Sequence, residues 1–251
     1  MNPTVSILRP RAANPATNPP IDEIVRASLA VKRAQALELL HGALEEHGAV
    51  TFANSFGAED MVLTDLILRE ALPITVFSLD TGRLPAETYA LMGEVERHYA
   101  TRLEVYFPDT AAVEHYVRTE GINAFYDAIE LRKRCCAIRK VEPLRRALAG
   151  KGAWVTGMRA AQSATRAALP VRQFDEANGL EKYNPLADWS EQDVWAYIRL
   201  HGVPYNVLHD QFYPSIGCAP CTRAITVGED VRAGRWWWED PDGKECGLHR
   251  K

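Results

Sequence analysis

Five cysteines are the residues of this 251-residue sequence best suited to chemistry. Four of them form two pairs, Cys135-Cys136 and Cys218-Ala219-Pro220-Cys221. Thiolate sulfur binds both zinc and iron–sulfur clusters, so the two pairs can supply a full set of four ligands. Adjacent residues of a helix point about 100° apart, which suits separate irons of a cluster better than one zinc ion. We therefore expect one [4Fe–4S] cluster on Cys135, Cys136, Cys218 and Cys221, with zinc as the alternative.

The fifth cysteine lies apart from the others, in the polar terminal run Lys244-Glu245-Cys246-Gly247-Leu248-His249. A cysteine in such a run is unsuited to a core position. His249 and nearby cations favour the nucleophilic thiolate, whereas Glu245 opposes it. Cys246 is therefore the candidate nucleophile, and a tail cysteine without a role is the alternative.

Composition limits the other functions open to this chain. The net charge of -4 provides no general attraction to nucleic acid or anionic membranes. An odd cysteine count without a secretory signal favours a reducing compartment, so we expect a cytoplasmic protein. Pro-rich residues 1–20 are expected to be a disordered tail, 21–230 a nucleotide-binding domain, and 231–251 a C-terminal segment with the catalytic cysteine. An assembly of identical chains remains open.

Hydrophobic periodicity predicts alternating strands and helices over the first two thirds of the chain. Short apolar runs rich in β-branched residues indicate strands at 49–53, 74–79, 103–107 and 153–157. Helical spacing indicates helices at 22–47, 61–69, 85–100 and 137–149. This order predicts an α/β fold whose parallel sheet carries helices on both faces.

Three polar loops follow predicted strands, where parallel sheets bind their ligands. The loop Asn54–Asp60 contains Ser55 and Gly57 before a helix, and free amides at a helix start attract anions. Asp80-Thr81-Gly82 can bind a ribose or adenine group or cap the next helix. Gly157–Arg166 places Arg159 and Arg166 around small residues, and guanidinium groups bind phosphate and sulfate. Arg232 and Arg235 form a second basic pair.

Together these motifs resemble the assimilatory adenylyl-sulfate reductases, in the adenine-nucleotide α-hydrolase-like superfamily. The resemblance runs from about residue 50 to 249. Its most specific marks are the two cysteine pairs and Glu245-Cys246-Gly247-Leu248-His249. Further marks are Ser55-Phe56-Gly57-Ala58-Glu59-Asp60, Leu79-Asp80-Thr81-Gly82 and Asn184-Pro185-Leu186-Ala187-Asp188-Trp189. Phe56 replaces a glycine of the superfamily's ATP-cleaving members, which argues against ATP cleavage.

The resemblance implies reduction of adenosine 5′-phosphosulfate (APS) to sulfite and AMP, for sulfate assimilation toward cysteine. It implies a Cys246 S-sulfonate that thioredoxin or a glutaredoxin-type dithiol resolves, and it links the cysteine pairs to APS over its 3′-phosphorylated form (PAPS). The substrate-binding residues expected on this basis are Ser55, Phe56, Gly57, Asp60, Leu79, Asp80, Thr81, Gly82, Lys140, Arg159, Arg166, Arg232, Arg235 and His249.

Three other functions are less well supported. A PAPS reductase is disfavoured by the cysteine pairs. A cluster-bearing tRNA-thiolating enzyme requires an ATP-type loop and a basic surface, and a zinc-stabilised nucleic-acid module conflicts with the acidic net charge. Trp236-Trp237-Trp238 either packs the C-terminal segment onto the domain or forms a partner surface.

Overall fold

The computed structural model describes residues 23–162 and 169–239. A six-stranded sheet in the order β3-β2-β1-β4-β6-β5 forms its centre. The sheet is parallel except for its last strand. The strands are β1 (Val50–Ala53), β2 (Thr75–Leu79), β3 (Glu104–Tyr106), β4 (Ala153–Val155), β5 (Arg172–Asp175) and β6 (Leu180–Tyr183). β5 runs antiparallel to β6, so the predicted α/β fold with a largely parallel sheet is confirmed.

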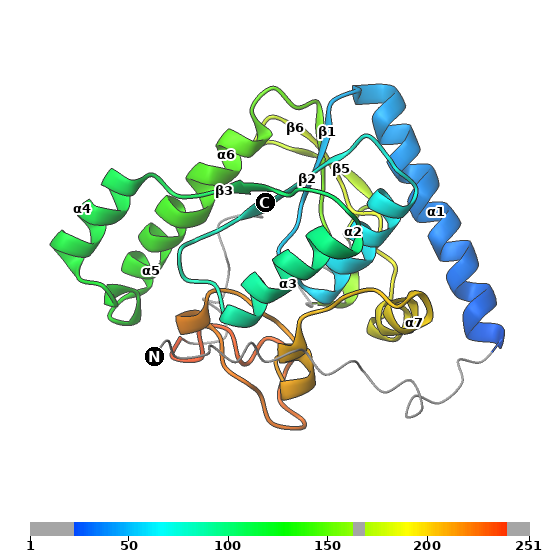
Figure 1. Cartoon of the computed structure of the whole chain (residues 1–251). Coiled ribbons are helices and arrows are strands. Elements are labelled where there is room, and N and C mark those ends of the chain that lie inside the picture. Colours follow the sequence, from blue (N-terminus) through cyan, green and yellow to red (C-terminus); the bar gives the residue numbers. More distant parts are fainter. Residues whose placement is uncertain (1–22, 163–168, 240–251) are drawn as a thin grey trace, which may run out of the picture.

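Helices cover both faces of this sheet (Figure 1). The larger core contains residues of α1 (Glu23–His47), α2 (Ala58–Arg69), α3 (Ala86–His98) and α7 (Glu191–His201). A smaller core on Phe77 and Trp154 is closed by Leu144 and Leu148 of α6 (Glu142–Leu148). Residue 22, where the first predicted helix begins, lies outside the described residues.

The crossovers change side at the centre of the sheet. α2 and α3 connect β1, β2 and β3 in sequence, and the chain then returns to place β4 on the other side of β1. This return passes through α4 (Thr110–Glu120), α5 (Ile129–Cys136) and α6. Right-handed crossovers in opposite directions cover opposite faces, so a crevice opens between the carboxyl ends of β1 and β4.

The helix predicted over 137–149 is part of a longer helical run. It starts with α5, passes through a π-helical turn at Ala137–Val141, and ends with α6. Pro143, in the first turn of α6, has no N–H to donate to the preceding turn, which favours a wider turn at this point. The double cysteine thus lies directly before a local change of helical pitch.

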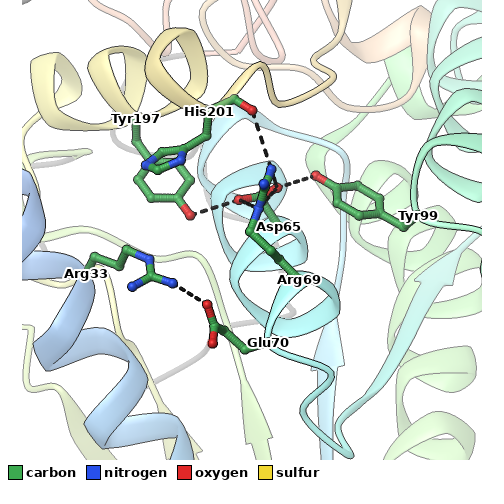
Figure 2. Close-up of polar contacts among 7 residues, drawn as sticks. All are labelled: Arg33, Asp65, Arg69, Glu70, Tyr99, Tyr197 and His201. Carbon is green, nitrogen blue, oxygen red and sulfur yellow. Dashed lines mark hydrogen bonds and ion pairs between the residues drawn. The ribbon is translucent and has the colours of Figure 1, made fainter.

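A buried carboxylate fastens α2 to its neighbours (Figure 2). Asp65 is 0% exposed and accepts hydrogen bonds of 2.8 Å each from Tyr99, Tyr197 and the Arg69 guanidinium. Burial, followed by the charge of Asp65, raises the pKa of both tyrosines, so they remain donors at neutral pH. This network holds α2, whose first turn faces the crevice. No described helix is long and apolar enough to cross a membrane.

We expect Asp65→Ala to lower the free energy of unfolding by about 3 kcal/mol, because its donors lose their acceptor in the interior. The matched control is Glu70→Ala at the C-cap of the same helix, which removes the part-exposed ion pair with Arg33. That change should cost only about 0–1 kcal/mol. Urea unfolding of both variants measures the difference, and equal small losses would contradict the role assigned to Asp65.

Candidate nucleotide and sulfur site

A large cleft opens at the carboxyl ends of β1, β2 and β4. Its volume is about 1470 Å³, ample for a nucleotide. It collects residues from all three predicted loops and from the C-terminal part of the chain. The predicted binding residues that line it are Ser55, Gly57, Asp60, Leu79, Thr81, Lys140, Arg159, Arg232 and Arg235. Phe56, Asp80 and Gly82 are not among the lining residues. Arg166, Cys246 and His249 lie outside the described residues.

The Asp60 carboxylate connects two of the loops at the crevice. It accepts hydrogen bonds from Ser55, at 2.7 Å from the backbone nitrogen and 2.6 Å from the hydroxyl. Gly157, after β4, is a further backbone donor. A Cβ on Gly157 would lie 2.1 Å from Asp60 Oδ1, so only glycine permits this approach. Asp60 therefore holds the loops in register, and its 8% exposure leaves it little access to a ligand.

Phe56 shapes the same loop through its backbone. Its φ of 62° is left-handed, and its N–H donates to Asn54 Oδ1 at 2.7 Å. Asn54 is held in turn by Thr64 of α2, at 2.9 Å. The phenyl ring is 1% exposed and belongs to the main core. The sequence predicted Phe56 as a binding residue, and the structure places it beneath the cleft.

Asp80 holds its own loop together rather than capping α3. Its Oδ1 accepts from the Gly82 backbone at 2.7 Å and from the Tyr89 hydroxyl at 2.8 Å. The N-cap position of α3 is Pro85, and no side chain caps the helix there. Gly82 adopts a φ of 69°, which glycine tolerates without strain. Both residues therefore fix the course of the loop that presents Thr81.

Thr81 connects the cleft to both cysteine-bearing segments. Its hydroxyl lies 3.2 Å from Cys218 Sγ, and its carbonyl accepts from Arg139 Nη1 at 2.6 Å. Arg139 follows the first cysteine pair. The neighbouring Arg83 carbonyl accepts from the Ala219 amide at 2.8 Å. The loop after β2 thus contacts both the π-helical turn after α5 and the second cysteine pair.

The four cysteines of the two pairs are free thiols. Burial, followed by the charge of Cys218, raises the pKa of Cys221 to about 12, while Lys140 and Arg235 act in the opposite direction. Burial likewise raises the pKa of Cys135, against the influence of Arg139. These mutual effects place Cys135 within electrostatic reach of Cys218 and Cys221.

This donor set fits an iron–sulfur cluster. Cys135, Cys218 and Cys221 lie within electrostatic reach of one another and of Arg139, Lys140 and Arg235, whose cationic groups suit an anionic cluster. Among the described residues, no group of three or more His, Cys, Asp or Glu side chains is arranged to hold a metal ion. The cluster assignment therefore rests on the chemistry of the donors and their cationic surroundings.

Two arginines of the cleft have fixed partners. Arg159 pairs with Glu59, at 2.7 Å from Nη2, and also donates to the Trp189 carbonyl at 3.2 Å. Arg235 donates to Ser215 and to the Ile216 carbonyl, at 3.2 Å each. Both guanidinium groups are thus oriented before any ligand arrives. The Glu59 contact could not be inferred from sequence, because it joins residues that lie 100 positions apart.

The three consecutive tryptophans differ in environment. Trp236 is 1% exposed and packs the C-terminal segment onto the domain, as expected from the first of the two alternatives. Trp237 is 39% exposed. Trp238 packs against Phe125 and Tyr126, and the Tyr126 hydroxyl donates to the Pro220 carbonyl at 2.7 Å. Within the triplet, Trp236 contacts Arg132 of α5 and Cys221 of the second cysteine pair, while Trp237 is partly exposed to solvent.

Comparisons with known proteins agree with this geometry. Residues 49–224 match the phosphoadenosine phosphosulfate reductase domain family. The chain is 64% identical to the adenosine 5′-phosphosulfate reductase of Allochromatium vinosum, over 89% of this chain and 88% of that protein. It is 52% identical to the protein of that name from Neisseria meningitidis serogroup A, over 92% and 96% of the two chains.

Solved structures show the same fold. A crystal structure of phosphoadenylyl-sulfate (PAPS) reductase from Candida auris, as a phosphate complex, matches with a TM-score of 0.66 and 29% identity, covering 82% of this chain and 99% of that one. An FMN adenylyltransferase from Candida glabrata matches with a TM-score of 0.57 and 16% identity, over 89% and 77% of the two chains. The second match concerns the fold alone.

Asp60 predicts a pH dependence of stability. Burial raises its pKa to about 6 from an ordinary 3.8, so the folded state binds the proton more tightly than the unfolded state. The wild type should therefore lose stability relative to Asp60→Asn as pH rises from about 4 through 6. Asparagine still accepts from Ser55, which makes it a suitable reference. Unfolding free energies at several pH values measure this, and parallel profiles would contradict it.

Proposed function

The chain belongs to the phosphoadenosine phosphosulfate reductase family, and from this membership we propose that it reduces APS to sulfite and AMP, with thioredoxin or a glutaredoxin-type dithiol as reductant. One observation carries the proposal: Thr81 lines a nucleotide-sized cleft, and its hydroxyl contacts Cys218, one of the four free thiols. The high identity to proteins named adenosine 5′-phosphosulfate reductase selects APS as the substrate. The reaction serves sulfate assimilation toward cysteine.

The nucleotide end of the substrate is proposed to bind at the crevice between β1 and β4. The first amides of α2 have no partner within the helix, and the first residues of α2 line the cleft, so these amides can donate to a phosphate there. The exposed Ser55 beside them is oriented by Asp60. Leu79 and Thr81 line the cleft at the end of β2 and would contact the adenosine.

The sulfate end is proposed to face the C-terminal part of the chain. Lys140, Arg232 and Arg235 line the cleft there and would neutralise the sulfate and the charge that develops on the leaving phosphate. Arg159 also lines the cleft, although its charge is partly neutralised by the ion pair with Glu59. We further assign Arg166 and His249 to the substrate from the resemblance.

Cys246 is the proposed nucleophile. Glu239 is the last described residue before it, and the seven residues from there to Cys246 span at most about 25 Å, a length that allows the thiol to reach the cleft. Its thiolate attacks the sulfur of the sulfate group, a sulfur–sulfur bond forms, and the bond from sulfur to the bridging oxygen breaks. AMP leaves with that electron pair and Cys246 carries an S-sulfonate.

A dithiol partner completes the cycle. One of its thiolates attacks Cys246 Sγ, sulfite leaves with the electron pair, and a mixed disulfide remains. The second thiol of the partner then displaces Cys246 as a thiolate. The partner is oxidised to a disulfide, and sulfur is reduced from the sulfate to the sulfite level.

Cys135, Cys136, Cys218 and Cys221 would hold one [4Fe–4S] cluster. When bound, the cluster would supply a fixed charge and a structural link between α5 and the second cysteine pair. It would not act as an electron donor, because thiol attack requires no electron from iron. We assign residues 21–230 to the nucleotide-binding domain and 231–251 to the segment of the nucleophile. Residues 1–20 lie outside the described residues. The free thiols and the dithiol reductant both suit the cytoplasm.

We expect anaerobically purified protein with thioredoxin to release sulfite from APS and to prefer APS strongly over PAPS. The reason is its 64% identity, over 89% of the chain, to a protein named adenosine 5′-phosphosulfate reductase. Sulfite release from each nucleotide measures this. Preference for PAPS would favour the alternative function suggested by the Candida auris structure. Turnover of neither nucleotide would contradict both assignments.

A pair of cysteine variants separates the nucleophile from the cluster ligands. Cys246→Ser should abolish sulfite release yet retain about four irons per chain and the visible absorbance of a cluster. Cys221→Ser should lose iron and absorbance. Iron analysis and absorption spectra of the two proteins measure this. Catalytic sulfite release by Cys246→Ser would disprove the nucleophile, and unchanged iron in Cys221→Ser would disprove the ligand.

A further inference from the structure

Trp236 lies where the C-terminal segment meets the rest of the molecule. Its ring contacts two guanidinium groups, with Arg132 Cζ at 4.6 Å and Arg235 Cζ at 4.9 Å from the ring centre. Its amide donates to the Cys221 carbonyl at 3.2 Å. Its φ of 44° is left-handed, a conformation that costs a bulky residue free energy and persists only where the surroundings enforce it.

Arg132 of α5 packs against Trp236 and helps to hold it in this conformation. Its Nε and Nη2 donate to the two carboxylate oxygens of Glu239, at 2.6 and 2.8 Å. The side chains of this pair are only 1% and 3% exposed. Cys136, one helical turn further along α5, is a third partner of the guanidinium. Arg132 thus contacts one cysteine pair, the Trp236 ring and Glu239 of the C-terminal segment.

A buried ion pair of this kind is a costly way to gain stability. Desolvation of the two charges offsets much of their attraction, and apolar replacements often stabilise a protein equally well. A two-bond contact between a guanidinium and a carboxylate does fix relative orientation closely. The geometry is therefore better suited to placing groups than to strengthening the fold.

We propose that Arg132 is a positioning residue for the reaction, acting through Trp236 on Arg235 and through Glu239 on the segment that carries Cys246. This inference rests on the proposed function. The Trp236 ring stands between Arg132 and the cleft guanidinium of Arg235. Gly217 faces that guanidinium with no room for a Cβ, which would lie 2.4 Å from Arg235 Nη2. Arg235 therefore has little freedom once Trp236 is fixed.

The second consequence concerns the nucleophile. Glu239 is seven residues before Cys246, so anchoring Glu239 restricts the volume within which the thiol can be found. A tethered reactant held near its target reacts far faster than a free one, and small displacements lower the rate by up to about a hundredfold. Arg132 therefore influences both the sulfate-binding cation and the approach of the attacking sulfur.

The test compares Glu239→Gln with Glu120→Gln. Glutamine keeps the size of Glu239 but removes the charge and one of the two acceptors. Arg134 lies on α5 like Arg132, but it is exposed, and it forms an ion pair with Glu120 of α4 at 2.6 Å. Glu120→Gln is therefore the matched control. We measure the single-turnover rate of S-sulfonate formation on Cys246 by mass spectrometry, AMP affinity, and hydrogen exchange of residues 231–239.

Glu239→Gln should form the S-sulfonate roughly 10- to 100-fold more slowly, with faster exchange at 231–239 and unchanged AMP affinity. Glu120→Gln should match the wild type in all three. If Glu239→Gln does not fold, Arg132→Lys replaces it, because lysine keeps the charge but not the two-bond geometry. Wild-type rates or exchange in the folded variant would overturn the positioning role. Absence of S-sulfonate in the wild type would instead overturn the proposed function, and the positioning role with it.

Discussion

The contact between the Asp60 carboxylate and the loops after β1 and β4 is the constraint on which the cleft depends. These loops diverge because the crossovers on either side of the β1–β4 pair cover opposite faces of the sheet. Asp60 draws them together through Ser55 and Gly157, and the missing Cβ of Gly157 makes the approach possible. The base of the crevice is therefore fixed at the start of α2, where the phosphate of the substrate is proposed to bind.

Buried groups that do not line the cleft hold α2 and the loop after β1 in place. Asp65, one turn beyond Asp60 on α2, binds tyrosines next to α3 and within α7, so the helix cannot shift without breaking buried hydrogen bonds (Figure 2). Phe56 contributes differently, by combining a buried ring with a left-handed backbone. Conformational strain in the loop is thus offset by packing beneath it.

Single residues also connect the cleft to the cysteine-bearing segments and to the C-terminal segment. Thr81 connects the end of β2 to Cys218 and Arg139, and Trp236 connects Cys221 to Arg132 and Arg235. Each junction contains a residue of the cleft and a residue of a cysteine-bearing segment. The proposed sulfate subsite and the proposed cluster site consequently share their supporting residues, so a change at one is expected to alter the other.

Local patterns predicted much of the framework but missed several elements. Apolar runs located β1, β2, β3 and β4 to within two residues at either end, because burial of a strand depends mainly on its own composition. The β5–β6 hairpin was missed although Asn178-Gly179 is a turn signal between its strands. α7 was also missed, despite the Ser190–Asp193 capping box at its start. These polar signals are short and common, and they gain meaning only once neighbouring elements are known.

The sequence by itself determined the α/β class, the positions of three loops at strand ends, and the presence of two cysteine pairs at a distance from Cys246 along the chain. Those features follow from residue type and spacing along the chain. Tertiary structure alone decided that Phe56 lies under the cleft, that Asp80 holds its own loop, and that Arg159 is paired with Glu59. It also decided that Arg132 meets Glu239, 107 residues later. Such contacts depend on how helices and loops pack around the sheet, and no local pattern encodes which distant side chains then become neighbours.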